Sequence, residues 1–263
     1  MERIVLVAGA SGFIGSYVVK ALSEKGFSPV LISRNPQKLK ERFPEFSVFS
    51  TSEPEKAFLL KPFAVVNSVG ILKEEDSTYE EAHVKFTERL VELSKKHGVK
   101  KFVQISALGT SPEEKSRYFK TKWEAEEIVR KSRIPYAILR PSIVLGAGQK
   151  LYEDLRELSR FLPVLGAPKM KVQPVRIEKV VDAVLKAVEC RITGTVELCG
   201  DEVVTMAELF RRVLSEMGIK RPVVEVPKFL LFPLAVLKIG GLDLEQFKMI
   251  KDTTCKGDAK DVR

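Results

Sequence analysis

A serine, a tyrosine and a lysine stand in an arrangement that could move a proton to or from an alcohol or ketone. Ser106 ends the apolar run 102–106, and Tyr118 and Lys122 follow it four residues apart. That spacing places both side chains on one face of a helix. A phenol has a free pKa of about 10, and a neighbouring ammonium lowers this pKa by stabilising the phenolate. We therefore expect Tyr118 to be a catalytic acid/base, Lys122 to tune it and hold ribose hydroxyls, and Ser106 to hydrogen-bond the reacting oxygen.

The spacing Tyr-x-x-x-Lys also occurs on many helices as a half-buried tyrosine beside a solvated lysine. Its position directly after a strand that ends in serine favours the catalytic interpretation. The value of that position depends on the rest of the chain forming a nucleotide-binding fold.

A glycine-rich turn near the N-terminus has the form of a phosphate site. An apolar run over 3–8 is followed by Gly9, Gly12 and Gly15, and then by an amphipathic segment over 16–25. Gly9 permits a sharp turn, Gly12 permits close approach of the backbone to a pyrophosphate, and Gly15 permits close packing of helix on strand. The free N–H groups and the positive end of the helix dipole supply the anion site. This context favours a dinucleotide site over an ordinary tight turn.

The residue after the second predicted strand indicates which dinucleotide is bound. An acidic residue there binds the ribose 2′-hydroxyl of NAD, whereas an arginine accommodates a 2′-phosphate. The strand ends in Ser33, Arg34 and Asn35, without a carboxylate. Arg34 can fork onto a phosphate. The sequence therefore favours NADP(H), with NAD(H) as the alternative, unless Arg34 is a surface residue that begins a helix.

Strands and helices alternate through the first 146 residues. We predict strands at 3–8, 29–33, 46–49, 64–67, 102–106 and 137–139, and helices at 16–25, 36–42, 77–97 and 116–132. Such alternation implies parallel connections and an α/β fold with a Rossmann-type, doubly wound parallel sheet. Ligands bind such sheets at the carboxyl ends of the strands, where Ser106 and the glycine turn would lie.

The pattern changes after Gly146. Helical segments near 149–161, 178–190, 205–217 and 243–252 alternate with short extended pieces at 195–198 and 223–226. We predict a Rossmann domain over 1–146 and a smaller α+β lobe over 147–263 for a substrate or partner, interleaved so closely that they could form one unit. The sequence of the lobe does not identify the small-molecule substrate. The candidate polar residues for binding it are Arg156, Arg160, Gln173 and Arg176.

The glycine turn, Ser106 and the pair Tyr118 and Lys122 resemble the extended and atypical short-chain dehydrogenase/reductase superfamily, of the NAD-dependent epimerase/dehydratase type. The resemblance covers the first 146 residues, through Leu139-Arg-Pro-Ser-Ile-Val-Leu-Gly146. The segments 67–72, 104–109 and 173–175 are most similar to a narrower group, which includes the NADP(H)-binding accessory subunit of respiratory complex I and its bacterial relatives.

The resemblance implies a role for each cofactor-binding position. The pyrophosphate would be lined by Gly9, Gly12, Phe13 and Ile14, with Ser11 and Gly15 in the same turn. Arg34 would contact the adenosine phosphate, and the middle of the cofactor would be contacted by Asn67, Ser68 and Val69. Tyr118 and Lys122 would contact the nicotinamide ribose, and the nicotinamide itself would be contacted by Pro141 to Val144, Ile143 included. His83 stands where many epimerases carry an asparagine, and we interpret it as a partly buried packing residue. Because complex I relatives often bind cofactor without clear turnover, a non-catalytic NADP(H)-binding accessory or assembly module is the alternative to an oxidoreductase.

Charge and cysteine content limit the partners. The net charge is +9, but lysines are mixed with glutamates and no run alternates basic and aromatic residues, which indicates a solvated surface and no nucleic-acid partner. The three cysteines have no metal-ligand spacing, so no metal site is expected. Their odd number fits a reducing cytosol better than a disulfide framework, and no secretory signal is visible. We expect a cytoplasmic protein, monomeric or, through the two long helices, homodimeric.

An apolar stretch over 227–241 is too short and interrupted to span a bilayer. We predict a helix packed on the small lobe, with Pro227 near its first turn and the pair Gly240 and Gly241 at its end. Lys228 and Lys238 flank the stretch. Contact with a membrane surface or a membrane complex is the alternative use of its apolar residues.

Overall fold

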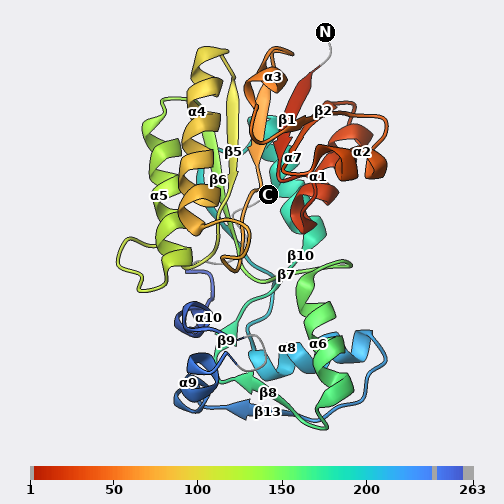
Figure 1. Ribbon diagram of the computed structural model, residues 1–263, viewed down its shortest axis with the longest axis vertical. Coiled ribbons are helices and arrows are strands. Elements are labelled where there is room, and N and C mark those ends of the chain that lie inside the picture. The colour runs from red at the N-terminus through yellow and green to blue at the C-terminus, as the bar shows by residue number, and fades with distance from the viewer. Residues whose placement is uncertain (1–2, 239–241, 257–263) are drawn as a thin grey trace.

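A parallel β-sheet frames the upper part of the molecule (Figure 1). The structure, a computed structural model, describes residues 3–238 and 242–256. Its seven strands lie in the order β11-β6-β5-β4-β1-β2-β3, and all neighbouring pairs are parallel. They are β1 (Ile4–Ala8), β2 (Ser28–Ser33), β3 (Ser47–Ser50), β4 (Ala64–Asn67), β5 (Lys101–Ile105), β6 (Tyr136–Pro141) and β11 (Gly194–Leu198). The predicted Rossmann-type parallel sheet is confirmed.

Helices cover both faces of the sheet because successive strand residues point to opposite sides. On β1, Val5 and Val7 pack in one core cluster, and Leu6 and Ala8 in the other. The first face carries α1 (Phe13–Glu24), α2 (Pro36–Arg42) and α7 (Ile177–Val188). The second carries α3 (Glu55–Phe58), the π-helical turn η1 (Glu80–Lys85), α4 (Phe86–Lys96) and α5 (Arg117–Lys131). Strand order reverses between β1 and β4, which opens a crevice at their carboxyl ends.

A smaller lobe lies below the sheet in Figure 1. Its helices are α6 (Lys150–Phe161), α8 (Met206–Glu216), α9 (Lys228–Val236) and α10 (Leu244–Met249). Its short strands pair as β7 (Val144–Leu145) with β10 (Val175–Arg176), β9 (Lys171–Val172) with β12 (Val204–Thr205), and β8 (Leu165–Pro168) with β13 (Val223–Val226). Between its two passages through the lobe, the chain returns to the sheet as α7 and β11.

The long helix predicted over 77–97 differs from the structure in its first half. There the chain forms the π-helical turn η1 over Glu80–Lys85, and α4 begins only at Phe86. Single π-turns inside helices often mark functional sites, and this turn lies against the predicted Tyr118 and Lys122.

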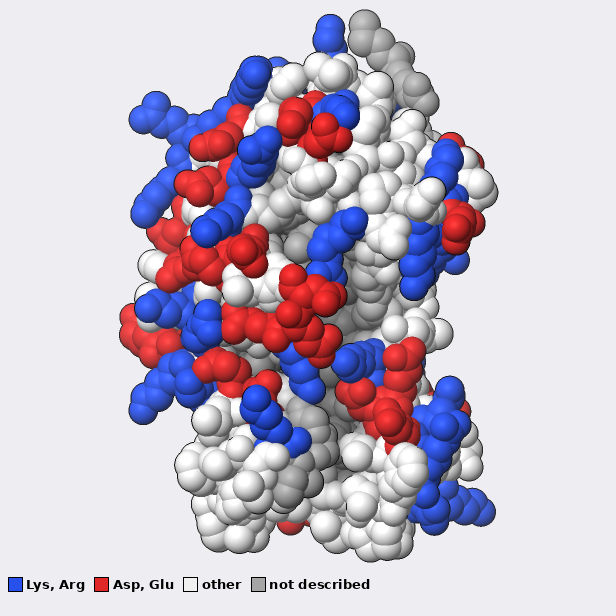
Figure 2. Space-filling view, in the orientation of Figure 1, with Lys and Arg blue, Asp and Glu red and all other residues white. Residues whose placement is uncertain are grey.

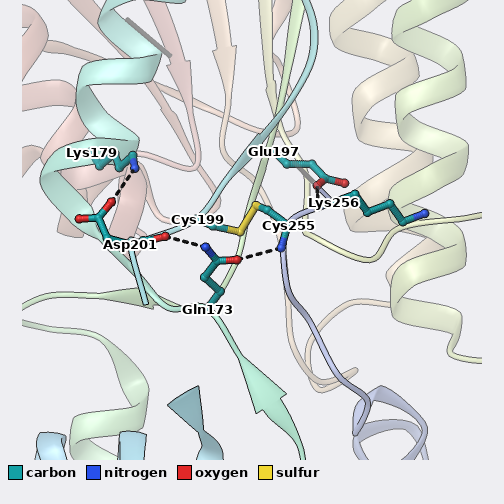
Figure 3. The surroundings of a disulfide bond; sticks show 8 residues. Gln173, Lys179, Glu197, Cys199, Asp201, Cys255 and Lys256 are labelled. Atoms are coloured by element: carbon teal, nitrogen blue, oxygen red, sulfur yellow. Dashed lines mark hydrogen bonds and ion pairs between the residues drawn. A yellow bond between two sulfur atoms is a disulfide. The ribbon is translucent and has the colours of Figure 1, made fainter. Parts of the chain in front are cut away.

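The expectation of unpaired cysteines is wrong. Cys199 and Cys255 form a disulfide, and their Cα atoms lie 6.2 Å apart although 56 residues separate them in the sequence. Figure 3 shows the cause: the C-terminal segment runs beside the end of β11, where the Gln173 side chain donates to the Gly200 carbonyl at 2.8 Å and accepts from the Cys255 N–H at 3.1 Å. Only the fold brings these cysteines together, so their spacing could not reveal the pair. Cys190 is free and exposed.

The apolar stretch over 227–241 does form the predicted helix. Pro227 caps α9, and only Leu231 and Ala235 of this helix are buried. Gly240 and Gly241, the predicted end, lie outside the described residues. Among the described residues, no helix is both long and apolar enough to cross a membrane.

Candidate functional site

The turn between β1 and α1 is shaped by its glycines. Gly9 has a φ of +81°, and a Cβ there would lie 2.8 Å from the Ser68 backbone. A Cβ on Gly15 would lie 2.2 Å from the Gly9 carbonyl oxygen, so α1 can approach the turn this closely only with glycine. Gly12 is the N-cap of α1, and neither a side-chain cap nor an acidic first-turn residue is present there. The N–H groups at this helix start are thus free to meet an anion.

A cavity of about 360 Å³ opens beside this turn, at the carboxyl ends of β1, β2 and β4. Of the predicted cofactor-binding residues it contains Gly9, Ser11, Gly12, Arg34, Ser68 and Val69. The wall also includes positions that sequence reasoning missed: Thr51 and Ser52 after β3, Gly70 and Ile71 after β4, and Ser77, Glu81, Ala82 and Phe86 around η1. Its shape, its open helix N-terminus and its place at the strand-order reversal fit a dinucleotide.

Arg34 lies at the rim of this cavity. Its side chain is 62% exposed, and its guanidinium is 4.0 Å from the Asp76 carboxylate, an ion pair between two solvated groups. Asn35 caps α2 by accepting from the Lys38 N–H, so its amide oxygen is engaged. The one acidic residue in the cavity wall is Glu81, whose carboxylate accepts hydrogen bonds from Ser77 and Thr78. The rim therefore offers a guanidinium to an incoming phosphate.

Asn67 lies behind the cavity wall and holds the wall in place through hydrogen bonds. It is fully buried, and its side-chain N–H groups donate to Thr87 and Gln104, both at 3.0 Å. Its oxygen accepts from the Val69 N–H at 3.2 Å. Ser68 donates to the Ala8 carbonyl at 2.7 Å and so ties the end of β4 to β1. The amide thus fixes the loop that lines the cavity.

Lys122 joins the cavity wall to the end of β5. Its ammonium is buried and donates to the Val69 carbonyl at 3.1 Å and to the Ile105 carbonyl at 3.3 Å. A Cβ on Gly70 would lie 2.8 Å from this ammonium, so a larger residue there would displace the end of the lysine side chain. Burial lowers the pKa of Lys122 to about 8, while the charge of Glu126 opposes the shift. The lysine thus lies between the cofactor cavity and Ser106, the residue that follows Ile105.

Ser106 presents a buried hydroxyl at this junction. Its side chain is 5% exposed, and its Oγ has no hydrogen-bond partner among the described residues. Ser142, directly after β6, has an unpartnered buried Oγ of the same kind. β5 and β6 are neighbours, so both hydroxyls lie at the carboxyl edge of the sheet. A buried hydroxyl without a partner is costly, and a bound polar group at this edge would supply one.

Tyr118 does not show the lowered pKa that the sequence predicted. Burial, followed by the neighbouring Tyr79, raises the pKa of Tyr118 to about 12. Lys122 makes its hydrogen bonds to backbone carbonyls and does not stabilise the phenolate. The Tyr118 ring packs edge-on against His83, with ring centroids 5.6 Å apart. At neutral pH Tyr118 is a phenol, which can donate a hydrogen bond or a proton.

His83 positions this cluster from η1. Its Nε2 accepts from the Ile71 N–H at 3.2 Å, and its Nδ1 lies 2.9 Å from the Thr121 hydroxyl. Burial and, next, the charge of Lys122 lower the pKa of His83 to about 2, so the imidazole is neutral. It is more fully buried than we expected, and it links the cavity loop to α5.

Several predicted cofactor residues lie outside the described cavity. Phe13 lines a second cavity of about 280 Å³ on the other side of the turn, together with Tyr17, Lys20 and Arg42. Ile14 packs on the sheet core. Pro141 is buried at the end of β6, and Ile143 packs on the core of the lobe.

Comparison with known proteins identifies the family of this chain. The family model described as NAD(P)H-binding matches residues 9–160, which include the glycine turn, η1 and α5. The chain belongs to this NAD(P)H-binding family. It is 28% identical over 254 residues to a mitochondrial protein of Arabidopsis thaliana named NADH dehydrogenase [ubiquinone] 1 alpha subcomplex subunit 9, covering 89% of this chain and 61% of that protein.

Two further relatives have different names. The chain is 28% identical to the mitochondrial NADH-ubiquinone oxidoreductase 40 kDa subunit of Neurospora crassa, covering 87% of this chain and 64% of that one. It is 27% identical to a ceramide reductase of Caulobacter vibrioides, covering 85% and 74%. The chain thus spans less than two thirds of the length of the two respiratory subunits.

Solved structures share the fold. The enzyme WbmH of Bordetella bronchiseptica, solved in complex with NAD+, superposes with a TM-score of 0.72 at 19% identity, over 86% of both chains. A dTDP-4-dehydrorhamnose reductase of Bacillus anthracis, solved with NADP, gives a TM-score of 0.70 at 16% identity, over 86% of this chain and 85% of that one. These structures share the Rossmann-like α/β fold of this chain. The match to the NAD(P)H-binding family model supports a nicotinamide cofactor.

Proposed function

We propose that this protein is an NADP(H)-dependent oxidoreductase that transfers a hydride between the nicotinamide and a carbonyl or carbinol carbon. The observation that carries this proposal is the pair of hydrogen bonds from Lys122, to Val69 in the cavity wall and to Ile105 beside Ser106. They support the proposal because they link the wall of the cavity, through Lys122, to the backbone beside Ser106.

The protonation states of the described residues favour reduction of a carbonyl. When bound, a reduced nicotinamide supplies the hydride. The Ser106 hydroxyl, which lacks a partner, would hold the carbonyl oxygen. As negative charge develops on that oxygen, the Tyr118 phenol would donate its proton, since an alkoxide is a stronger base than a phenolate. The raised pKa of Tyr118 keeps this proton in place at neutral pH.

Two features support NADP(H) over NAD(H). Arg34 is exposed at the cavity rim, where a 2′-phosphate could meet its guanidinium. No carboxylate follows β2 to accept hydrogen bonds from an unmodified ribose, and Glu81 already accepts bonds from Ser77 and Thr78. Charge at the rim thus favours the phosphorylated cofactor.

The test is turnover with a substrate panel. The protein is incubated with NADPH and nucleotide sugars, small carbonyls and long-chain keto lipids, the last chosen because one relative is named a ceramide reductase. We expect oxidation of NADPH with at least one class, and a fall in kcat of about 10²- to 10⁴-fold in Tyr118→Phe. Tyr152→Phe removes a hydroxyl bonded to Glu216 in the lobe and serves as the control. Turnover that persists in Tyr118→Phe would contradict the proposed acid.

A non-catalytic NADP(H)-binding module of a membrane-associated assembly is the second proposed function. Two relatives support it, since both are named as mitochondrial subunits of an NADH dehydrogenase or NADH-ubiquinone oxidoreductase. In such a module NADPH would raise the melting temperature without being consumed by any member of the panel. Absence of NADPH oxidation with every member of the panel, while NADPH still raises the melting temperature, separates this function from the first.

A further inference from the structure

Helix α9 exposes apolar side chains along most of its surface. Phe229, Leu230, Phe232, Val236 and Leu237 at its C-cap are each at least half exposed, and Phe229 reaches 71%. At about 100° per residue these positions lie on both flanks and the outer side of the helix, so they form a ridge rather than a groove. The narrow strip of Leu231 and Ala235 attaches α9 to the lobe.

A second apolar group lies at the same lower end of the molecule in Figure 1. Phe161 ends α6, Leu162 and Val164 follow it, and the three are exposed by 78%, 43% and 44%; Val224 on β13 is 48% exposed. Pairing of β8 with β13 joins the two segments. We name this end, made of residues 160–169 and 219–238, the apolar end. Isolated exposed leucines are ordinary, but a cluster of this extent indicates a binding surface.

The charges of the apolar end have one dominant sign. Residues 160–169 contain Arg160 and Lys169, and residues 219–238 contain four more cations; Glu225 is the single acidic residue of these two segments. Figure 2 shows the lower end as a largely uncharged surface with lysine and arginine at its sides. On the neighbouring α10, Asp243 caps the helix and Glu245 pairs with Lys248.

We infer that the apolar end docks on an anionic lipid surface. A ridge of phenylalanine and leucine can enter the headgroup region, and cations around it would meet lipid phosphates. α9 has nine residues, which is far too short to span a bilayer but sufficient to lie in its interface. The convex shape and the one-signed charge favour a membrane over a second copy of this chain, whose own apolar end would carry the same cations.

Docking in this direction leaves the nucleotide site free. The cofactor cavity lies at the carboxyl ends of the strands and is lined by residues between 9 and 86, whereas the apolar end is the lower end of the lobe in Figure 1. The proposal is therefore independent of turnover, and its failure would leave the proposed oxidoreductase untouched.

The test is flotation of the full chain with vesicles of phosphatidylcholine alone or mixed with phosphatidylglycerol. We expect binding to the mixed vesicles, weakened by high salt, and at least about tenfold weaker binding to the neutral ones. Phe229→Ser with Leu230→Ser should reduce binding to the mixed vesicles by about tenfold or more. Leu59→Ser with Leu60→Ser, at exposed positions after α3, should not change it. Both pairs are exposed, and an unchanged melting temperature confirms folding.

The charge is tested separately. Lys169→Glu with Lys220→Glu should lower binding to mixed vesicles by about tenfold, while Lys25→Glu with Lys96→Glu, on the sheet half, should change it much less. Absence of flotation, equal binding to neutral and mixed vesicles, or a dimer in solution that Phe229→Ser with Leu230→Ser dissociates would each overturn the proposal. The last outcome would assign the ridge to a second copy of this chain.

Discussion

The sheet half of the molecule buries charged side chains, whereas the lobe exposes apolar ones. In the sheet half, charged groups lie inside: Glu126 is fully buried between Arg130 and Arg140, and the Lys122 ammonium is buried against backbone carbonyls. In the lobe, apolar groups lie outside, with Phe229 and Leu237 exposed by 71% and 68%. Internal charge suits the positioning of a small polar ligand, whereas external apolar surface suits contact with something large. Similarity to NAD(P)H-binding proteins therefore accounts for the buried polar groups of the sheet half better than for the exposed apolar surface of the lobe.

The buried carboxylate of the sheet half should give the largest stability effect. Glu126 accepts from Arg140 Nε at 2.8 Å and from the Nη2 atoms of Arg130 and Arg140, each at 2.5 Å. Glu126→Ala leaves the partly buried Arg140 without its partner and should lower the free energy of unfolding by about 3 kcal/mol. Glu127→Ala, which removes a partly exposed carboxylate from the same helix, should cost less than about 1 kcal/mol. Denaturant unfolding measures the free energy of unfolding of both variants. Equal losses would show that the ion pairs of Glu126 contribute no more than those of Glu127.

The disulfide tests how the lobe is tied to the sheet. Cross-linking across 56 residues restricts the unfolded chain and stabilises the fold by up to about 4 kcal/mol. Cys255→Ser should lose most of this, whereas Cys190→Ser, at the free cysteine, should lose little. Since neither cysteine lines the cavity, NADPH affinity should be unchanged in both variants. A parallel loss of affinity in Cys255→Ser would show that the two halves are coupled.

The lowered pKa of Lys122 predicts a pH dependence of stability. Between its pKa of about 8 in the fold and 10.5 in the unfolded chain, the unfolded state binds more protons, so this lysine makes stability rise with pH. Over that window its contribution is on the order of 2–3 kcal/mol. Lys122→Met should remove this part of the rise, measured as the difference between the unfolding free energies of the two proteins from pH 7 to pH 10. If the unfolding free energies of wild type and Lys122→Met changed in parallel with pH, the lowered pKa of Lys122 would be contradicted.

The sequence predicted the sheet better than the lobe, for a physical reason. Buried parallel strands such as 64–67 are continuous apolar runs bounded by turns, so their limits can be identified locally. The two-residue strands of the lobe, such as β9 and β12, carry no periodicity and exist only through tertiary pairing. The segment 195–198 was predicted as a short extended piece of the lobe, whereas it forms β11 beside β6 and completes the sheet.

The same limit applies to the site. The glycine turn lines the cavity and Lys122 contacts the cavity wall, but the catalytic and cofactor-binding roles inferred from the spacings stay predictions. The direction of the Tyr118 pKa could not be foreseen, because it depends on burial against Tyr79 and on Lys122 bonding to carbonyls instead. Gly70 lies in the segment 67–72 that carried the resemblance, but its close contact with the Lys122 ammonium could not be foreseen because it depends on how α5 packs.

The central claim is that the cavity beside the glycine turn binds NADP(H) with Arg34 at the 2′-phosphate. Calorimetric titration of NADPH and NADH into wild type and Arg34→Glu tests it most directly, with Lys25→Glu as a charge control. We predict tighter binding of NADPH to wild type, loss of about 10- to 100-fold of that preference in Arg34→Glu, and no loss in the control. Equal affinities of wild type for NADPH and NADH, or a preference that survives in Arg34→Glu, would contradict it.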